Sequence, residues 1–207
     1  MQKVYIMNER LLSILDRWVL FVDKYDVMSN NTMLDGKDRD HYVSNEYLES
    51  IQADHIGHPE TARSYCIKPP HYKGVDKNYQ LEYNILDSEM RTELGVRQSA
   101  LSQLYPEDGF IAWHSNADAS SFNLIFTWSE KGDGYFKYVD PITKNHIWMV
   151  DKKGWQCKAG YFGSNDEPDK VMYHCAATNC KRITLSYTLG FDESYWKDAI
   201  EHINTKV

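Results

Sequence analysis

The chain has 207 residues, a formal net charge of −7, 42% hydrophobic residues and 26% charged residues, an ordinary composition for one folded domain. This acidic balance excludes a whole-molecule electrostatic footprint for DNA or RNA, although a local basic groove is compatible with it. The longest apolar run, Trp18 to Val22, is too short to cross a membrane. The composition therefore predicts a compact globular protein without a membrane partner.

The polar start of the chain and the cysteine pattern bear on its compartment. Asn8, Glu9 and Arg10 lie where a secretory signal would be apolar. The four cysteines follow no zinc-binding spacing, which favours reduced thiols. We expect a single cytoplasmic domain over 1–207, with helical and loop support including one strand over 1–98, a β core over 99–191 and a C-terminal helix over 192–207.

The first half of the support region reads as two helices and two irregular segments. Apolar residues at three- and four-residue spacing predict a helix over residues 7–26, capped by Asn8 or Ser13. A polar loop over 29–41 then precedes a second helix over Tyr42 to Ile56. Glycine and proline make Gly57 to Tyr72 irregular. No cysteine or acid completes a metal-ligand spacing with its histidines, which are therefore expected to be exposed or hydrogen-bonded: His55, His58 and His71.

In the second half of the support region, a segment in which apolar and polar residues alternate precedes a helical segment. Aromatic and aliphatic residues alternate with polar ones from Tyr79 to Leu86, which predicts a strand. Asp87 or Ser88 would then cap a helix that bends at Gly95 and runs to Leu104.

From Tyr105 onward the chain is typical of a β-barrel or sandwich, because short strands alternate with turn residues. The expected strands are Phe110 to Trp113, Phe122 to Trp128, Tyr135 to Val139, Ile147 to Val150, Trp155 to Phe162, Val171 to Ala176 and Arg182 to Leu189. A short amphipathic helix over 192–204 follows them.

A stretch from Tyr105 to Asp118 carries the strongest chemical signal. It delivers His114, Asn116 and Asp118 at period-two spacing. Residues i, i+2 and i+4 of a strand point to one face. This face would therefore gather an imidazole, a carboxamide and a carboxylate.

A second polar segment lies sixty residues further on, at His174, and a third begins at Arg182. Both histidines follow an aromatic residue that would face the packed side of a strand, so that each imidazole faces the other way. Arg182 shares a face with Thr184, and Ser186 and Thr188 continue it. Such a face lies either in water or along a polar cavity, where a guanidinium can bind a carboxylate through two hydrogen bonds.

These segments resemble the Fe(II)- and 2-oxoglutarate-dependent oxygenases over about 90 residues, Ser99 to Phe191. The family has a His-x-Asp/Glu pair, a distant second His, and an Arg followed two residues later by a hydroxyl or amide residue. The resemblance implies a double-stranded β-helix, or jelly roll, with His114 and His174 on Fe(II) and Arg182 and Thr184 on 2-oxoglutarate. Tyr105 stands nine residues before His114, as does a cosubstrate-binding tyrosine in the branch that repairs alkylated nucleic acid.

The chain departs from the family pattern at the third metal ligand, because Asn116 stands two residues after His114. Asn116 can bind through its amide oxygen. Asp118 can supply the charge if the turn-rich segment after Asn116 curls back, since residues four apart in an extended strand are about 13 Å apart. An exogenous anion such as chloride is the third alternative, as in the halogenase members of the superfamily.

The resemblance implies an enzyme that uses Fe(II), 2-oxoglutarate and O₂ to hydroxylate a C–H bond of a small molecule, peptide or nucleotide. Two alternatives stay open: a halogenase-like enzyme of the same fold, and a non-enzymatic cupin-like barrel that binds metal or a small ligand. No further catalytic residue is expected beyond the metal ligands.

Overall fold

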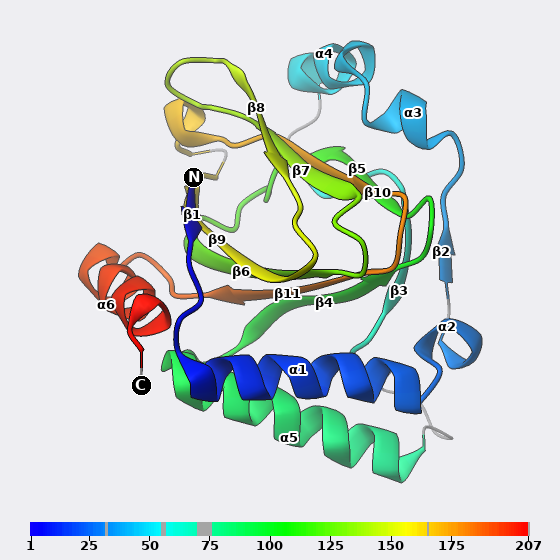
Figure 1. The fold of residues 1–207 in the computed structure, drawn as a ribbon. Coiled ribbons are helices and arrows are strands. Elements are labelled where there is room, and N and C mark those ends of the chain that lie inside the picture. Colours follow the sequence, from blue (N-terminus) through cyan, green and yellow to red (C-terminus); the bar gives the residue numbers. More distant parts are fainter. Residues whose placement is uncertain (32, 55–56, 70–75, 165, 207) are drawn as a thin grey trace.

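The computed structural model describes residues 1–31, 33–54, 57–69, 76–164 and 166–206. The fold is mostly antiparallel β, with one curled sheet and a few helices (Figure 1). The strands are β1 (Gln2–Val4), β2 (Met33–Asp35), β3 (Ala62–Cys66), β4 (Ser99–Tyr105), β5 (Phe110–His114), β6 (Ser121–Ser129), β7 (Gly134–Val139), β8 (His146–Val150), β9 (Gly154–Phe162), β10 (His174–Thr178) and β11 (Arg182–Thr188). The helices are α1 (Glu9–Lys24), α2 (Val27–Asn30), α3 (Arg39–Tyr42), α4 (Asn45–Asp54), α5 (Lys77–Leu94), the 3₁₀ turn η1 (Pro168–Lys170) and α6 (Glu193–Asn204).

The sheet curls so that its two ends face each other. Its strand order is β1-β9-β6-β11-β4-β3-β5-β10-β7-β8, and β2 pairs with β3. In Figure 1 the strands β5, β10, β7 and β8 lie over β9, β6, β11 and β4. This arrangement is consistent with the expected jelly roll, and it leaves two inner faces that meet in the middle of the molecule.

Helices α1 and α5 cover the outer face of the lower layer (Figure 1). They pack through an edge-to-face contact of Trp18 and Tyr83, with ring centroids 5.3 Å apart. The outward-facing residues of β11, Ile183, Leu185 and Tyr187, are fully buried in the same hydrophobic core. Because strand side chains alternate, this burial turns the even-numbered residues of β11 inward.

The side chain of Asn8 contacts the three helices α1, α5 and α6. Its side chain caps α1 by accepting a hydrogen bond from the Leu11 amide at 2.9 Å. Its amide nitrogen lies 3.4 Å from a Glu93 oxygen on α5 and 3.1 Å from the His202 ring on α6. The backbone amide of Asn8 also donates to the carbonyl of Ile203. One fully buried side chain therefore links three helices.

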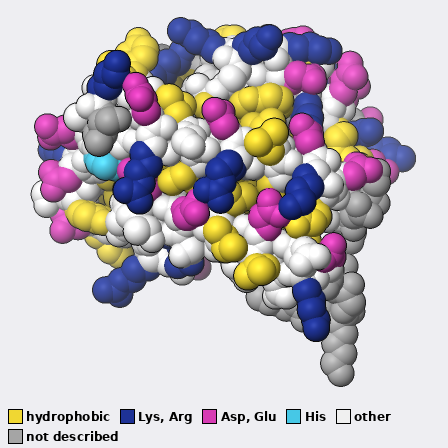
Figure 2. Space-filling model, turned by 60° about the horizontal axis from the view of Figure 1, so that its bottom comes forward, with side chains coloured by type: hydrophobic (Ala, Val, Ile, Leu, Met, Phe, Trp, Pro, Cys, Tyr) yellow, Lys and Arg dark blue, Asp and Glu magenta, His cyan; other side chains and the backbone are white. Residues whose placement is uncertain are grey.

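The surface carries charges of both signs. Figure 2 shows Lys and Arg side chains interspersed with Asp and Glu across the face turned forward there, with hydrophobic side chains between them. Among the described residues, no helix combines the length and apolar character that crossing a bilayer requires.

The expected strand over Tyr79 to Leu86 is wrong, because these residues belong to α5. The buried residues of α5 recur at helical spacing, Tyr79, Tyr83, Leu86, Met90 and Leu94, whereas Leu81 and Ile85 are exposed. Because large apolar residues lie on both the buried and the exposed face of this helix, the sequence shows the two-residue alternation that is typical of a strand.

Other boundaries also differ from the expectation. The helix ends at Leu94, where Gly95 adopts a left-handed conformation (φ 68°), and β4 replaces the expected helical run to Leu104. The segment Gly57 to Tyr72 contains strand β3, and the expected polar loop 29–41 contains β2 and most of α3. Among its described residues, the support region thus holds three short strands rather than one. The expected strand from Val171 begins only at His174.

Candidate metal and anion site

A cavity of about 400 Å³ lies between the two inner faces of the curled sheet. Its walls come from β4, β6 and β11 on one side and from β5, β7 and β10 on the other. His114, His174, Arg182 and Thr184 all line it. The polar face of β11 therefore borders a cavity, which is the second of the two alternatives that the sequence leaves open.

The two histidines meet across a pair of antiparallel strands. His114 is the last residue of β5, His174 is the first residue of β10, and the two are direct partners in the strand register. Their ring centroids are 4.0 Å apart. Residues sixty positions apart in the chain are thus brought together by strand pairing.

Both imidazole rings are held in the same way. The Nδ1 atom of His114 lies 2.8 Å from the carbonyl oxygen of Ala112, and that of His174 lies 2.9 Å from the carbonyl oxygen of Met172. A carbonyl oxygen only accepts, so each Nδ1 carries the proton and donates it. Each Nε2 is then the atom with the free lone pair, which is the tautomer that a metal ion requires.

Burial keeps both rings neutral. Each side chain is about 7% exposed. Burial lowers the pKa of His174 to about 4, and burial together with the neighbouring His174 holds the pKa of His114 well below its ordinary value. Both lone pairs are therefore available at neutral pH without the loss of a proton.

Aromatic rings surround His174. Phe136 stacks on it with ring centroids 5.5 Å apart, and the edge of Phe162 approaches it at 4.9 Å. These contacts fix the ring plane and shield that side of the histidine pair from water.

The strand ends at His114, so the expected common face of His114, Asn116 and Asp118 does not form. A turn follows, in which Ala117 has a positive φ of 51° and the amide of Ala119 donates to the carbonyl of Asn116. Asn116 lines the cavity, whereas Asp118 is exposed and does not. The turn thus separates the two residues that the sequence offered as the third ligand.

The donor set fits a divalent transition metal at two of three positions. Imidazole nitrogens suit iron, and an amide oxygen such as that of Asn116 is a neutral, weaker donor. Within the described residues, no group of three His, Cys, Asp or Glu side chains is placed to hold a metal ion. His58 lines the cavity and is exposed, whereas His55 and His71 lie outside the described residues.

Arg182 forms the second polar centre of the cavity. The residue is 2% exposed; its Nε donates to Asp151 Oδ2 at 2.8 Å and its Nη1 donates to Thr184 Oγ1 at 2.7 Å. The ring of Tyr105 lies under the guanidinium, 5.4 Å from Cζ to the ring centroid. Strand register places these residues together, because Arg182 is paired directly with Tyr105.

Asp151 pairs with a second buried cation. Lys158 Nζ lies 3.1 Å from Asp151 Oδ1, and the side chains of Lys158 and Asp151 are 1% and 0% exposed. Burial alone would raise the pKa of Asp151, but Arg182 and Lys158 hold it below its ordinary value. Burial lowers the pKa of Lys158 to about 8, and the neighbouring Arg182 adds to this effect while Asp151 opposes it.

Asp151 and Lys158 were not anticipated from the sequence, although the alternation of side chains along β9 could have indicated the inward position of Lys158. Cys157 and Ala159 belong to the core against α1 and α5, so alternation turns Lys158 toward the inside of the curled sheet. A lysine in the middle of a strand with an inward position requires a buried partner. No local pattern points to Asp151, which follows β8.

Gln103 presents an unpaired polar atom beside this centre. It lines the cavity and pairs with Thr184 in the strand register. Its Oε1 is buried, and no hydrogen-bond partner for it exists among the described residues. A bound molecule in the cavity would meet this amide group.

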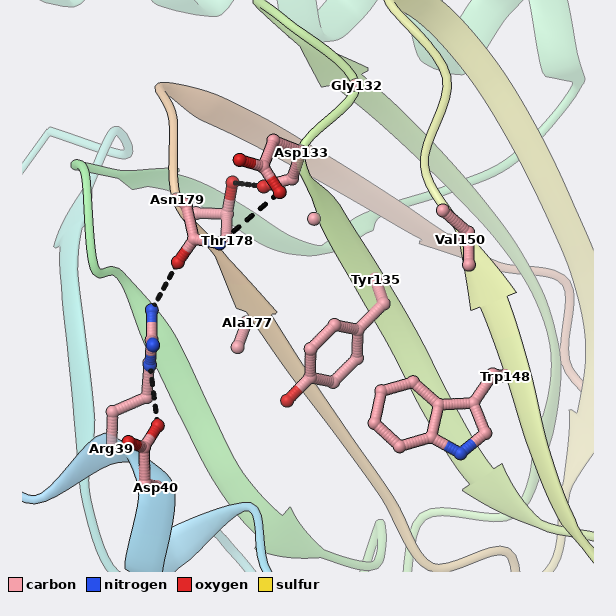
Figure 3. Close-up of a pocket in the computed structure, with 11 residues that line it drawn as sticks. Arg39, Asp40, Gly132, Asp133, Tyr135, Trp148, Val150, Ala177, Thr178 and Asn179 are labelled. Atoms are coloured by element: carbon pink, nitrogen blue, oxygen red, sulfur yellow. Dashed lines mark hydrogen bonds and ion pairs between the residues drawn. The ribbon is translucent and has the colours of Figure 1, made fainter.

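A second pocket of about 250 Å³ lies on the outer side of β7 and β8 (Figure 3). Tyr135 and Trp148 form its aromatic wall, with ring centroids 4.5 Å apart. Arg39 donates to Asn179 Oδ1 at 2.6 Å on its opposite side. Arg39 also pairs with Asp40, and Asp133 accepts a hydrogen bond from the side-chain amide of Asn179, so the charged groups of this pocket already have partners.

Comparisons with known proteins gave structural likeness only. No protein-family model and no curated protein matches the chain. A prolyl-4-hydroxylase from Pseudomonas putida is 13% identical, with 83% of this chain and 100% of that chain covered and a TM-score of 0.35.

Two other solved structures are similar to the same degree. A prolyl hydroxylase from Trichoplax adhaerens, in complex with a hypoxia inducible factor peptide fragment, is 11% identical over 89% of this chain and 94% of its own, with a TM-score of 0.39. The viral collagen prolyl hydroxylase of Paramecium Bursaria Chlorella virus-1, a 2OG complex, is 14% identical over 78% and 96%, with a TM-score of 0.32. The assignment of the site rests on its own geometry.

Proposed function

We propose that the chain is an Fe(II)- and 2-oxoglutarate-dependent oxygenase of double-stranded β-helix type that hydroxylates a C–H bond. The observation that carries this proposal is the pairing of His114 with His174, whose Nδ1 atoms each lie within hydrogen-bond distance of a backbone carbonyl oxygen. Both lone pairs belong to Nε2 because both Nδ1 atoms donate to backbone carbonyls, and both rings share a cavity with Arg182.

The roles of the chain's own residues follow from their placement. His114 and His174 would hold the metal, and Asn116, which lines the same cavity, would be the third ligand. Arg182 would bind the distal carboxylate of 2-oxoglutarate with its remaining N–H groups, and the Thr184 hydroxyl keeps the guanidinium in orientation. When bound, the iron supplies O₂ activation coupled to oxidative decarboxylation of 2-oxoglutarate to succinate and CO₂.

Tyr105 would take the role that the resemblance implies. It is 2% exposed and packs under the guanidinium, and burial raises the pKa of its phenol while Arg182 opposes this effect. The neutral phenol would keep its proton to donate to the cosubstrate.

A halogenase-like activity is the second candidate, and one observation favours it. Asn116 replaces the carboxylate, and Asp118 is exposed outside the cavity lining. Two neutral imidazoles and a neutral amide leave the full charge of a divalent ion uncompensated, which favours an anion beside it. Chloride-dependent products would distinguish this candidate from the hydroxylase.

An anaerobic Fe(II) titration followed by a 2-oxoglutarate consumption assay tests the proposal. Wild type should bind one Fe(II) and convert 2-oxoglutarate to succinate slowly without added substrate, and His174→Ala should do neither. Trp148→Ala, which removes an aromatic wall of the outer pocket and changes no residue that lines the inner cavity, is the matched control and should behave as wild type does. Fe(II) binding that survives in His174→Ala would refute the metal site, and a wild type that never consumes 2-oxoglutarate would favour a binding barrel.

A further inference from the structure

Two buried cations share a single buried carboxylate behind the cavity. Asp151 accepts from Arg182 at 2.8 Å through one oxygen and from Lys158 at 3.1 Å through the other. Two positive groups and one negative group leave one net positive charge in the interior. Such a charge is costly without a further anion.

Only one of the two cations reaches the cavity. Arg182 lines it, whereas Lys158 does not. Lys158 faces Asp151 and lies 3.4 Å from the Thr127 hydroxyl. Lys158 can therefore influence a ligand in the cavity only indirectly, through its hydrogen bond to Asp151 and through the electrostatic potential of its positive charge.

We propose that Lys158 is a positioning residue that keeps Arg182 available to an anionic ligand. It does so by binding one oxygen of the Asp151 carboxylate and neutralising part of its negative charge. Without Lys158, Asp151 would neutralise Arg182 alone, and the guanidinium would attract a second carboxylate only weakly. With Lys158, the excess positive charge stays at the cavity wall. This inference rests on the proposed function, since the ligand is taken to be the distal carboxylate of 2-oxoglutarate.

The hydrogen bonds of Arg182 leave part of its guanidinium available for a ligand. Its Nε edge faces Asp151 and its Nη1 is bonded to Thr184. Among the hydrogen bonds of the described residues, none uses Nη2. The guanidinium thus retains donors for a ligand while its orientation is fixed from behind.

The surroundings of Lys158 make its charge sensitive to pH. The titratable groups that act on it are Asp151 from the turn after β8, Arg182 from β11 and the neighbouring Cys157 thiol. With its pKa lowered to about 8, Lys158 loses its proton as the pH rises through that value. The net charge of the cluster then falls from one to zero, and the ligand site should weaken.

Calorimetric titration of 2-oxoglutarate under anaerobic conditions, with saturating Mn(II), tests the proposal. At pH 7, Lys158→Met should raise the Kd for 2-oxoglutarate about tenfold, the size expected when one unit charge is removed within about 10 Å at an effective dielectric constant of about 20. Lys158→Arg should restore most of the affinity because it restores the charge. Lys137→Met, which removes a lysine buried outside the cavity, is the control and should bind as wild type does.

A pH series separates a charge effect from a packing effect. In wild type the Kd for 2-oxoglutarate should rise between pH 7 and pH 9, and in Lys158→Met it should not change over this range, while the Kd for Mn(II) stays equal in the two proteins at each pH. Equal 2-oxoglutarate affinity and equal pH profiles in wild type and Lys158→Met overturn the inference but leave the proposed function intact. Failure of wild type itself to bind 2-oxoglutarate overturns the proposed function and the inference with it.

Discussion

Replacement of Lys158 by methionine should change the pH dependence of folding stability. Lys158 is 1% exposed and paired with Asp151. Methionine keeps much of the length of the side chain and removes the ammonium group. The variant therefore isolates the free energy that is linked to the protonation of one buried lysine.

The magnitude follows from the two pKa values of Lys158. Its ordinary value is 10.5, and burial lowers the pKa to about 8 in the folded protein. Between these values the unfolded chain binds a proton that the folded chain has released, so the free energy of unfolding rises with pH. The gap corresponds to about 3 kcal/mol, at about 1.4 kcal/mol per pH unit. Below pH 8 both states are protonated and the contribution is constant.

Urea denaturation from pH 7 to pH 10.5 measures this linkage. Buried tyrosines work in the opposite direction at the upper end, because burial raises the pKa of Tyr79 and Tyr83 to about 12 and their contribution is lost above pH 10. The quantity to compare is therefore the wild-type free energy minus that of Lys158→Met, in which the tyrosines cancel. This difference should rise by about 3 kcal/mol. A difference that stays flat across the range would refute the assignment of a charged, strained Lys158 at neutral pH.

The remaining predictions concern the site itself. His114→Ala and His174→Ala should each abolish stoichiometric Fe(II) binding in an anaerobic titration while the far-UV CD spectrum stays unchanged, because each removes one of two strong donors; wild-type metal content in either variant would contradict the assignment. Arg182→Ala should weaken 2-oxoglutarate binding by about 2–3 kcal/mol in calorimetry and spare metal binding; equal affinity would remove Arg182 from the ligand site. Asn116→Asp should tighten metal binding by adding an anion, whereas Asp118→Ala should bind as wild type does because Asp118 is exposed. A sharp loss of Fe(II) affinity in Asp118→Ala, with little change in Asn116→Ala, would make Asp118 the third ligand.

The alternation of polar and apolar residues made it possible to predict which side chains of a core strand face inward. The alternation of Arg182 and Thr184 with buried apolar residues correctly separates the two faces of β11. The histidine pair could be anticipated only as two polar positions, because the register that opposes His114 to His174 depends on the pairing of distant strands.

Two features were beyond a local pattern. The helix α5 has apolar residues on its exposed side, Leu81 and Ile85, and these imitate the period of a strand. The composition after Asn116 indicates a turn, but the direction in which this turn carries Asp118 depends on the positive φ of Ala117, a conformation that alanine rarely adopts. Both failures arise because tertiary packing overrides local preference.

The buried Asn8 has a consequence for how the protein opens. Because one side chain contacts α5 and α6 while capping α1, fraying of either chain end breaks bonds in all three helices. The three helices should therefore exchange their amide hydrogens as one cooperative unit, with similar opening free energies, rather than peel away one at a time. We therefore expect the helical layer outside β11 to open as one unit, and slow fluctuations of the cavity to arise mainly in strands β5, β7 and β10 on its other side.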